Sequence, residues 1–408
     1  GDDERFEYIY KFVSSRKIEE GNLEHNMGIL AEGTLYVARF DGNSPADEID
    51  GSGELPEDGA FDGTIEWLPL MTAHADGEDE SHVDGMDAAE VCVYTRQAAD
   101  SLGVTRMDRP EDVEASPVTG KVYAALTNNK YRGMAEGGDD NKIDQETDGA
   151  GRPYEGPTEV APVTENKNGL VLEMDDDHAG TTGTWNLLLV CGDPDEAYSY
   201  FGGFDKEDVS PISCPDNLAF DEYGNLWIST DGNALGSNDG LYAVAVEGER
   251  RGETKCFLTV PVGAETCGPI VEGNRVMVNV QHPGEDDDAT PENPISNWPD
   301  GGDAQPRPAV VQVVRADGGG EIVDGHRAGE LHQRTAEEAA VLPRLHQRRR
   351  HGHGGGGGEH LRLGVDDRGS LLFRVRPRNP VPPHLQRQRH RRQQRRVVVE
   401  VVAHRLLV

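Results

Sequence analysis

The alternation of apolar and polar residues along this chain predicts an all-β protein. Short apolar or alternating runs bounded by Gly, Pro, Asn and Asp are typical of β-strands. They occur at 35–40, 65–70, 122–126, 170–174, 185–190, 241–246 and 256–260. The first residues alternate as well, with Phe6, Tyr8, Tyr10 and Phe12 separated by other side chains. One stretch, 87–102, has the period of an amphipathic helix.

The clearest single unit is residues 214–232, which we interpret as a β-hairpin with a polar group at each end. Asp216 precedes the apolar run 218–220, and the second run, 226–228, leads to Asp231. Between the runs, 221–224 supplies a turn in which Gly224 tolerates a positive φ. Because the two strands of a hairpin run in opposite directions, both polar ends reach the same side of the sheet.

The same pattern occurs twice more. In 109–129 the first strand begins with Glu111, the turn ends at Gly120, and the second strand ends at Asn128 and Asn129. In 265–285 the first strand begins with Glu265, and the second strand ends at His282 and Glu285. Repeated hairpins with one polar end are typical of a β-propeller, in which the inner strand ends converge on a central axis. We therefore predict a six-bladed propeller, incomplete at both ends, with long acidic loop insertions at 41–62, 73–87, 133–167 and 283–307.

The charge is distributed unevenly. Residues 325–408 contain 18 Arg, no Lys and 7 acids, whereas residues 1–324 contain 21 basic and 68 acidic residues. An acidic body with few lysines is typical of a protein that stays soluble in concentrated salt, so we predict a halophilic protein. No apolar run approaches the length of a transmembrane helix, so we expect no membrane span.

The amino-acid composition of the chain changes near residue 322. His, Gln, Arg and Gly dominate the remainder, and Phe373 is its sole aromatic residue, so base stacking is not supported and we expect no nucleic-acid partner. A switch from Lys to Arg with many Gly and His is typical of a GC-rich gene translated out of frame. We predict a body of 1–322 and a disordered tail of 323–408.

The five cysteines have no Cys-x-x-Cys spacing, which argues against a zinc site, and their odd number argues against a disulfide framework. Cys214 and Cys267 lie beside acids of the hairpins. A metal or redox role for either thiol is an alternative to the simpler interpretation that they are small buried apolar residues.

Several short motifs of the sequence resemble those of the PhoX family of alkaline phosphatases. They are GDDERFEYIYKFV at 1–13, EGTLYVARF at 32–40, MDRPE at 107–111, LTNN at 126–129, SCPDNL at 213–218 and VQHPGE at 280–285. The resemblance covers 1 to about 322 and implies an extracellular or periplasmic phosphatase for phosphate acquisition. In that family an N-terminal part with a Cys-containing metal motif precedes residue 1, so we expect this chain to be a fragment with impaired activity.

The chemistry of the predicted axis depends on cations, because clustered carboxylates alone repel a phosphate dianion. Carboxylate and Asn oxygens suit Ca²⁺ and ferric iron (Fe³⁺), and the resemblance implies a mixed iron–calcium cluster that hydrolyses phosphomonoesters. The candidate metal ligands are Glu111, Asn128, Asn129, Asp216, Asp231, Glu265, His282 and Glu285. No side chain is assigned as catalytic, the expected partner is a small phosphomonoester, and we expect a monomer.

Two other functions fit the same polar strand ends. One is a calcium-dependent lactonase-type propeller, and the other is a non-catalytic calcium-binding propeller module. Neither function explains the PhoX-like motifs at 1–13, 107–111 and 280–285. Metal content together with hydrolysis of a phosphomonoester and of a lactone separates the three.

Overall fold

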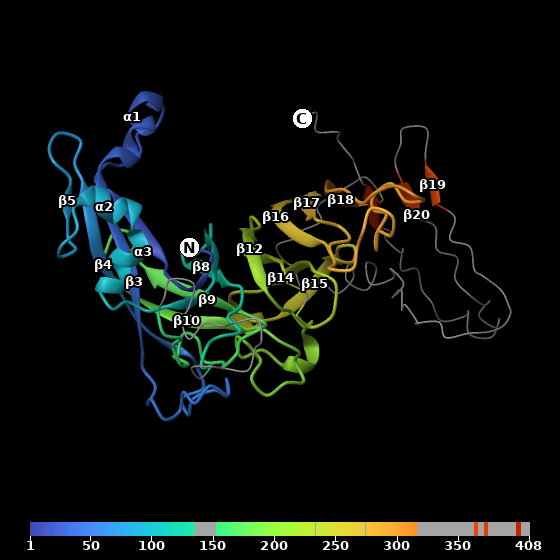
Figure 1. The fold of residues 1–408 in the computed structure, drawn as a ribbon, viewed down its shortest axis with the longest axis horizontal. Coiled ribbons are helices and arrows are strands. Elements are labelled where there is room, and N and C mark those ends of the chain that lie inside the picture. Colours follow the sequence, from blue (N-terminus) through green and yellow to red (C-terminus); the bar gives the residue numbers. More distant parts are fainter. Residues whose placement is uncertain are drawn as a thin grey trace.

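The structure is a computed structural model that describes residues 1–134, 152–232, 234–273 and 275–315, together with three short strands of the C-terminal part. The described residues form antiparallel sheets joined along a curved path, with the N-terminus beside β8 in the middle of the molecule (Figure 1). The prediction of an all-β propeller-type fold is confirmed.

The largest sheet has nine strands. Its main path is β2 (Tyr10–Ser14), β3 (Gly33–Gly42), β4 (Asp62–Ala73), β10 (Thr182–Val190), β9 (Leu170–Asp176), β8 (Val122–Leu126) and β7 (Pro110–Ala115), with β5 (Glu80–Ser81) beside β4 and β11 (Tyr200–Phe201) beside β10. Within it, β7 to β10 form a four-stranded meander, which is the form of a propeller blade.

Two further four-stranded sheets follow. The first consists of β12 (Pro215–Phe220), β13 (Leu226–Thr230), β14 (Gly240–Val244) and β15 (Thr254–Thr259). The second consists of β16 (Glu265–Glu272), β17 (Arg275–Gln281), β18 (Ala309–Arg315) and β21 (Val397–Glu400). The three predicted hairpins are thus β7–β8, β12–β13 and β16–β17, each antiparallel.

The first residues differ from the predicted alternating strand. A short β1 (Arg5–Glu7) pairs with β6 (Met107–Asp108), and the chain then continues into β2. Phe6, Glu7, Tyr8 and Ile9 are all buried, because this segment is enclosed on both sides. The simple rule of one buried and one exposed face does not apply to such a segment.

The predicted helix at 87–102 forms as two pieces, α2 (Ala88–Val93) and α3 (Thr95–Ser101). Asp87 and Glu90 form a reciprocal capping box at the start of α2. Tyr94 separates the two helices in a non-helical conformation. The buried side chains Val91, Ala98 and Ala99 pack against strands β3 and β4, which explains the apolar stripe.

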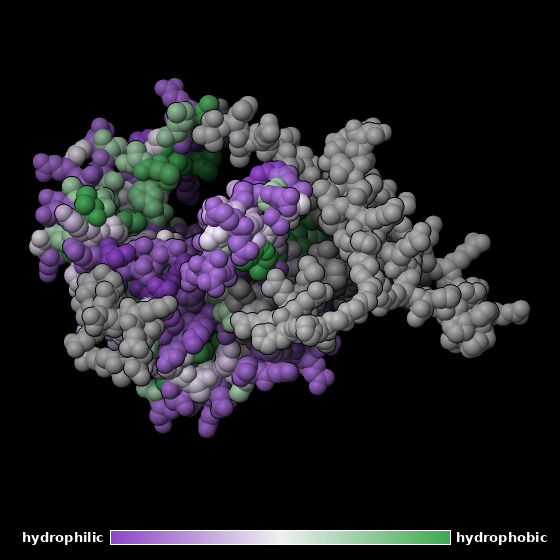
Figure 2. All heavy atoms as spheres, turned by 45° about the vertical axis from the view of Figure 1, so that its right-hand side comes forward, coloured by the Kyte–Doolittle hydropathy of each residue, from purple (hydrophilic) through white to green (hydrophobic). Residues whose placement is uncertain are grey.

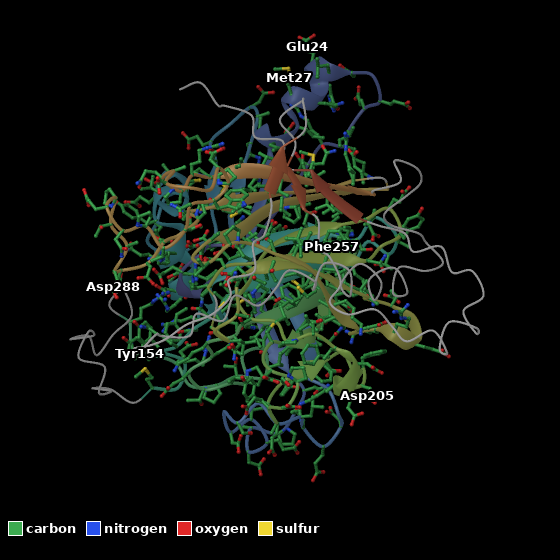
Figure 3. All side chains as sticks on the ribbon, turned by 90° about the vertical axis from the view of Figure 1, so that its right-hand side faces the viewer. Glu24, Met27, Tyr154, Asp205, Phe257 and Asp288 are labelled. Atoms are coloured by element: carbon green, nitrogen blue, oxygen red, sulfur yellow. The ribbon has the colours of Figure 1, made fainter. Side chains whose placement is uncertain are left out.

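The remaining helical segments are short and lie in loops. They are α1 (Leu23–Met27) and the 3₁₀ turns η1 (Ile29–Ala31), η2 (Lys206–Asp208) and η3 (Gly248–Arg250). Figure 3 shows Glu24 and Met27 of α1 projecting away from the sheets. No helix of the described residues is long and apolar enough to span a membrane.

The apolar cores lie within the nine-stranded sheet and between consecutive sheets. One packs Trp67, Trp185 and their neighbours inside the nine-stranded sheet, a second joins β8 to β10 with β12–β14, and a third joins β13 and β14 with β16–β18. Most of the visible surface of the described residues is hydrophilic, with a smaller apolar area in the upper left of Figure 2. This surface agrees with the excess of acids in the body.

Most of the predicted tail, 323–408, lies outside the described residues, as does 135–151 of the predicted loop 133–167. Within the tail the structure describes β19 (Leu363–Val365) and β20 (Leu371–Phe373), which pair with each other, and β21. β21 pairs with β18 as the fourth strand of its sheet.

Candidate functional site

Three strands each carry an acid near their first residue, and these acids lie close enough to act on one another through their charges. Glu111, Asp216 and Glu265 lie at the beginnings of β7, β12 and β16, the first strand of each successive sheet unit. β12 contacts both of the other two strands. Side chains fix this contact, because Leu218 N donates to Asp112 Oδ2 (3.0 Å) and Gly268 N donates to Asn217 Oδ1 (2.7 Å).

A repeated backbone feature precedes each of these acids. The residue two positions earlier has a positive φ: 54° at Arg109, 52° at Cys214 and 65° at Gly263. For a residue with a side chain this left-handed conformation is uncommon and costs about 1–3 kcal/mol when the surroundings enforce it. A left-handed residue therefore precedes all three acids at the same spacing, and strain is accepted at two of them.

Glu111 lies against Asp3 and Arg109. The Arg109 guanidinium donates to both carboxylates, with Nε to Asp3 Oδ1 at 2.8 Å and Nη2 to Glu111 Oε1 at 3.2 Å. Burial raises the pKa of Glu111 to about 8, and a hydrogen bond with Asp3 and the charge of Asp216 act in the same direction, while Arg109 opposes them.

Asp216 and Glu265 face Asp231, which follows β13. Burial raises the pKa of Asp216 to about 7, and the charges of Asp231 and Asp3 add to the shift. Burial also raises the pKa of Glu265 to about 7, assisted by the charge of Asp231, a side-chain hydrogen bond with it, and the charges of Asp216 and Glu285. These groups are close enough to disfavour one another's ionisation.

The other predicted ligands are placed differently. Asn128 lies against Cys214, with Nδ2 3.9 Å from Cys214 Sγ. The fully buried Asn129 instead donates from Nδ2 to Asp108 Oδ1 (2.9 Å) and accepts from Tyr131 N (3.1 Å). The His282 side chain is exposed and makes no hydrogen bond or ion pair with the described residues, whereas Glu285 acts on Glu265 by its charge.

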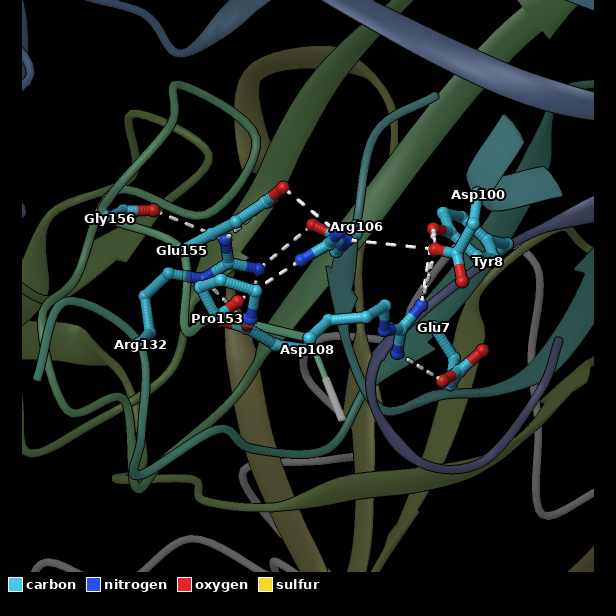
Figure 4. Close-up of polar contacts among 10 residues, drawn as sticks. Glu7, Tyr8, Asp100, Arg106, Asp108, Arg132, Pro153, Glu155 and Gly156 are labelled. Atoms are coloured by element: carbon cyan, nitrogen blue, oxygen red, sulfur yellow. Dashed lines mark hydrogen bonds and ion pairs between the residues drawn. The ribbon is translucent and has the colours of Figure 1, made fainter. Parts of the chain in front are cut away.

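A buried network of arginines and acids supports the segment that carries Arg109. Arg132 donates to Asp108 Oδ1 from Nε (3.0 Å) and Nη2 (2.8 Å), and the side chains of this pair are 0% exposed. Asn166 donates to the other oxygen of Asp108 at 3.2 Å. Figure 4 shows this pair beside Arg106 and the cluster of Glu7, Tyr8 and Asp100. The network fixes residue 108, and so the position from which Arg109 reaches the acids.

The two cysteines near the acids are free thiols. Cys267 Sγ is 3.9 Å from Glu265 Oε2, and burial together with the charge of Glu265 raises its pKa to about 12. Burial raises the pKa of Cys214 to about 11. Both thiols therefore stay protonated at neutral pH in this arrangement.

The donor set fits hard cations better than soft ones. The clustered atoms are carboxylate oxygens, and burial together with neighbouring acids raises the pKa values of Glu111, Asp216 and Glu265, so that a bound cation would stabilise their ionised forms. As the side chains stand, no group of three His, Cys, Asp or Glu among the described residues has the arrangement that holds a metal ion. The cluster is thus suitable in chemistry and needs side-chain adjustment in geometry.

Two members of the cluster were missed from the sequence, Asp3 and Arg109. Asp3 lies in the first residues, which lead into β1, and Arg109 directly precedes the strand that carries Glu111. The pairing of β1 with β6 brings them together across more than one hundred residues. The signal that could have indicated Arg109 is its place in the motif Met-Asp-Arg-Pro-Glu at 107–111, two residues before Glu111.

Comparison with known proteins identifies the family of the chain. The family model for alkaline phosphatase PhoX matches residues 1–284. Among solved structures, Pseudomonas fluorescens PhoX in complex with vanadate, a transition state analogue, matches with 34% identity and a TM-score of 0.57. The match covers 78% of this chain and 50% of that chain, so this chain spans about half the length of its solved relative.

Two further comparisons add little. No curated protein sequence matches the chain. A solved protein whose gluconolactonase assignment is itself provisional matches at 16% identity and a TM-score of 0.24, covering 60% of this chain and 53% of its own, which is too low to bear on the lactonase alternative. The family model covers well over half of the residues, and the 34% identity to a solved relative agrees with it. The chain therefore belongs to the PhoX family of alkaline phosphatases.

Proposed function

We propose that this protein hydrolyses phosphomonoesters by metal-dependent catalysis at the acidic cluster on the inner side of the propeller. The observation that carries the proposal is the convergence of Glu111, Asp216 and Glu265 from three successive sheets, each with a raised pKa. Support comes from the family and from a solved relative in complex with vanadate, a transition state analogue.

We propose calcium and ferric iron as the cations, held by Glu111, Asp216, Asp231 and Glu265, with Asn128, Glu285 and His282 at the margin. When bound, such cations neutralise the charge of the phosphate and lower the pKa of water. Asn129 is a weaker candidate than the sequence indicated, because both ends of its amide are already hydrogen-bonded within the support of Asp108.

Arg109 is the cation that this chain itself contributes to the cluster. Its guanidinium is planar and presents paired N–H donors, a geometry that matches two oxygens of a phosphate. In the structure those donors are occupied by Asp3 and Glu111. We propose that Arg109 exchanges part of this carboxylate pairing for the phosphate, so that it orients the ester and stabilises charge that develops during transfer.

The proposal concerns the whole protein, because the chain spans about half of its solved relative. We propose that residues 1–322 are the phosphatase body, that 323–408 are a tail without a part in the site, and that the protein is exported and monomeric. For this chain alone we expect low activity, since phosphoryl transfer depends on exact positioning of charge.

Hydrolysis of p-nitrophenyl phosphate with added Ca²⁺ and Fe³⁺, against a lactone and against metal-free protein, tests the proposal. We expect metal-dependent phosphomonoesterase activity that falls at least about 100-fold in Arg109→Ala, as one lost charge-stabilising donor typically costs. Arg39→Ala, at an exposed pair on β3, is the matched control. Lactone hydrolysis, or metal binding without either activity, would instead support one of the alternatives.

Calcium binding is tested separately by thermal unfolding. Because cations bind the folded cluster and relieve its repulsion, we expect Ca²⁺ to raise the melting temperature and a chelator to lower it. Glu265→Gln is expected to reduce the increase, whereas Glu80→Gln in the exposed β5 is expected to leave it intact. A melting temperature that Ca²⁺ and chelator leave unchanged would contradict calcium binding.

A further inference from the structure

Thr127 connects the two chain segments that precede Glu111 and Asp216. It follows β8 directly and is fully buried. Its backbone N–H donates to Arg109 O at 3.0 Å, and its hydroxyl donates to Pro215 O, also at 3.0 Å. One residue therefore holds a carbonyl at the entrance to β7 and a carbonyl at the start of β12.

The two connected segments have the same local design. Residues 109–111 (Arg-Pro-Glu) and 214–216 (Cys-Pro-Asp) each consist of a left-handed residue, a proline and an acid. Proline has no N–H, so a carbonyl is the only backbone group through which it can be held by a hydrogen bond. The Pro215 carbonyl belongs to the peptide bond that joins it to Asp216, so the partner of this carbonyl directly limits where the acid lies.

A second link lies on the other side of the two acids. Leu218 N donates to Asp112 Oδ2 at 3.0 Å. Leu218 follows Asp216 by two positions, and Asp112 follows Glu111 by one. The pair of acids therefore lies between two connections of the first hairpin to β12. Of the two connecting side chains, the Thr127 hydroxyl is the uncharged one, so its removal changes the spacing of the acids without changing the charge around them.

Close packing surrounds the Thr127 bridge. A Cβ atom at Gly169, where φ is 82°, would lie 2.3 Å from Thr127 O and 2.6 Å from Pro215 Cδ. Only glycine fits at this position, because a third backbone segment lies directly against the bridge. Valine in place of Thr127 has nearly the same shape, so it removes the hydrogen bond to Pro215 without adding bulk to this crowded region.

We propose that the Thr127 hydroxyl is a positioning group for the reaction: it sets the spacing between Asp216 and the 109–111 segment, and through that spacing the affinity of the acids for a cation. The inference rests on the proposed function for the role of the acids. Carboxylates from separate sheets hold one ion well only at the correct separation, and groups that orient metal ligands typically contribute about 10- to 100-fold in affinity.

Calorimetric titration of the full chain with Ca²⁺ tests the proposal, because it measures the site without turnover. In Thr127→Val the hydroxyl is lost, and we expect Ca²⁺ to bind about 10-fold or more weakly. Thr127→Ser retains the hydroxyl, and we expect it to recover most of the wild-type affinity. If the valine variant does not fold, Thr127→Ala, which removes the hydroxyl and adds no bulk, takes its place in the titration.

Thr254→Val is the matched control. Thr254 is also fully buried, and its hydroxyl donates to a carbonyl, Gly252 O, at the same distance of 3.0 Å. It begins β15, the strand at the opposite edge of the sheet from β12. Both valine substitutions should lower the melting temperature, but Thr254→Val should leave the Ca²⁺ affinity unchanged.

The outcomes separate this inference from the proposed function. Wild-type Ca²⁺ affinity in Thr127→Val overturns the inference, and so does an equal loss of affinity in Thr127→Val and Thr254→Val, which identifies a general effect of lost stability. Ca²⁺ binding that depends on the hydroxyl, without phosphomonoesterase activity, supports the inference and contradicts the proposed function.

If the wild-type chain binds no Ca²⁺, the proposed cation fails and the position of the acids still tests the inference. Crystal structures of metal-free wild type and Thr127→Val then give the separation between the backbones of Arg109 and Asp216. A changed separation supports a positioning role for the hydroxyl, and an unchanged separation overturns it.

Discussion

Glu7 is a carboxylate enclosed in the protein without forming part of the acidic cluster. Its side chain is 0% exposed, and it pairs with Arg152 Nη2 at 2.5 Å and with Arg96 Nε at 2.8 Å. Burial nevertheless raises its pKa from 4.5 to about 7, because removal from water outweighs the pull of the two arginines. The ion pair therefore compensates only part of the desolvation of this carboxylate.

This residue predicts a particular pH dependence of stability. Between pH 4.5 and 7 the folded protein retains a proton on Glu7 that the unfolded chain releases, so stability falls as the pH rises. Glu7→Gln should reduce this fall by on the order of 3 kcal/mol, measured by urea unfolding at pH 5 and pH 7.5. Glu4→Gln, an exposed neighbour, is the control, and identical falls in wild type and Glu7→Gln would refute the assignment.

At the scale of residues, sequence reasoning found the acids whose position follows from local pattern. Glu111, Asp216 and Glu265 begin strands, and that alone directs them to one side. It could not find Asp3, because Asp3 joins the cluster through a pairing with residues about one hundred positions later. It also could not foresee that Asn129 would be drawn away by Asp108, since nothing local marks Asp108 as a buried charge that needs donors.

At the scale of elements, the β12–β13 hairpin depends on its turn. Asp221 is 2% exposed and accepts from Tyr223 N (3.0 Å), Asn225 N (2.9 Å), Asn225 Nδ2 (2.8 Å) and Trp227 Nε1 (3.0 Å). The carboxylate thus organises the turn and anchors the indole of the second strand. Gly224, with φ of 86°, closes the turn as its position in the sequence predicted.

Asp221→Ala should consequently destabilise the protein. Loss of the shared acceptor leaves several donors of the turn without their partner, at about 1–3 kcal/mol for each buried group. Urea unfolding measures the change. Asp205→Ala is the control, because Asp205 accepts only from Glu207 N in an exposed turn at the periphery of Figure 3. Equal effects of the two substitutions would exclude a special role for Asp221.

Most elements followed from periodicity, and the exceptions have physical causes. The three hairpins and the seven strand runs form close to their predicted positions. The helix at 87–102 is interrupted because Tyr94 ends α2 in a conformation that α3 cannot continue. The predicted alternation at 6–12 is not observed where both faces of the segment are covered. In such a segment the polarity of a side chain does not indicate which face of the strand it lies on.

At the scale of the whole molecule, charge dominates. The chain carries a net charge of −36, and the body alone is more acidic because the basic residues are concentrated after 324. Repulsion among exposed acids destabilises the compact folded state. Salt weakens this repulsion, because the screening length is about 3 Å at 1 M compared with about 10 Å at 0.1 M.

We therefore expect the melting temperature to rise between about 0.1 M and 1 M NaCl, because the screening length falls from about 10 Å to about 3 Å over this range. A chain ending at residue 322 should show a larger rise than the full chain, because it loses the basic tail. Calorimetry in the presence of a chelator separates this screening from calcium binding. A melting temperature independent of salt in both chains would argue against adaptation to salt.

The fold class could be predicted from the sequence, but the pairing of strands between units could not. Repeated hairpins indicated a propeller, but nothing in the sequence indicated that β10 pairs with β4 and so joins two units into one nine-stranded sheet. Nor did it indicate that Val397–Glu400 would pair with β18. Edge strands accept partners by backbone hydrogen bonds, which carry little sequence information.

The left-handed step before each acid has a consequence for protein engineering. The positions 109, 214 and 263 hold Arg, Cys and Gly, three unrelated residue types with one backbone conformation. What is repeated is therefore a backbone conformation, in which a left-handed residue is followed two residues later by a carboxylate near the start of a strand. A designer who transplants this three-residue step onto a blade without a functional group should obtain a carboxylate aimed inward, with the first position left open for a second chemistry.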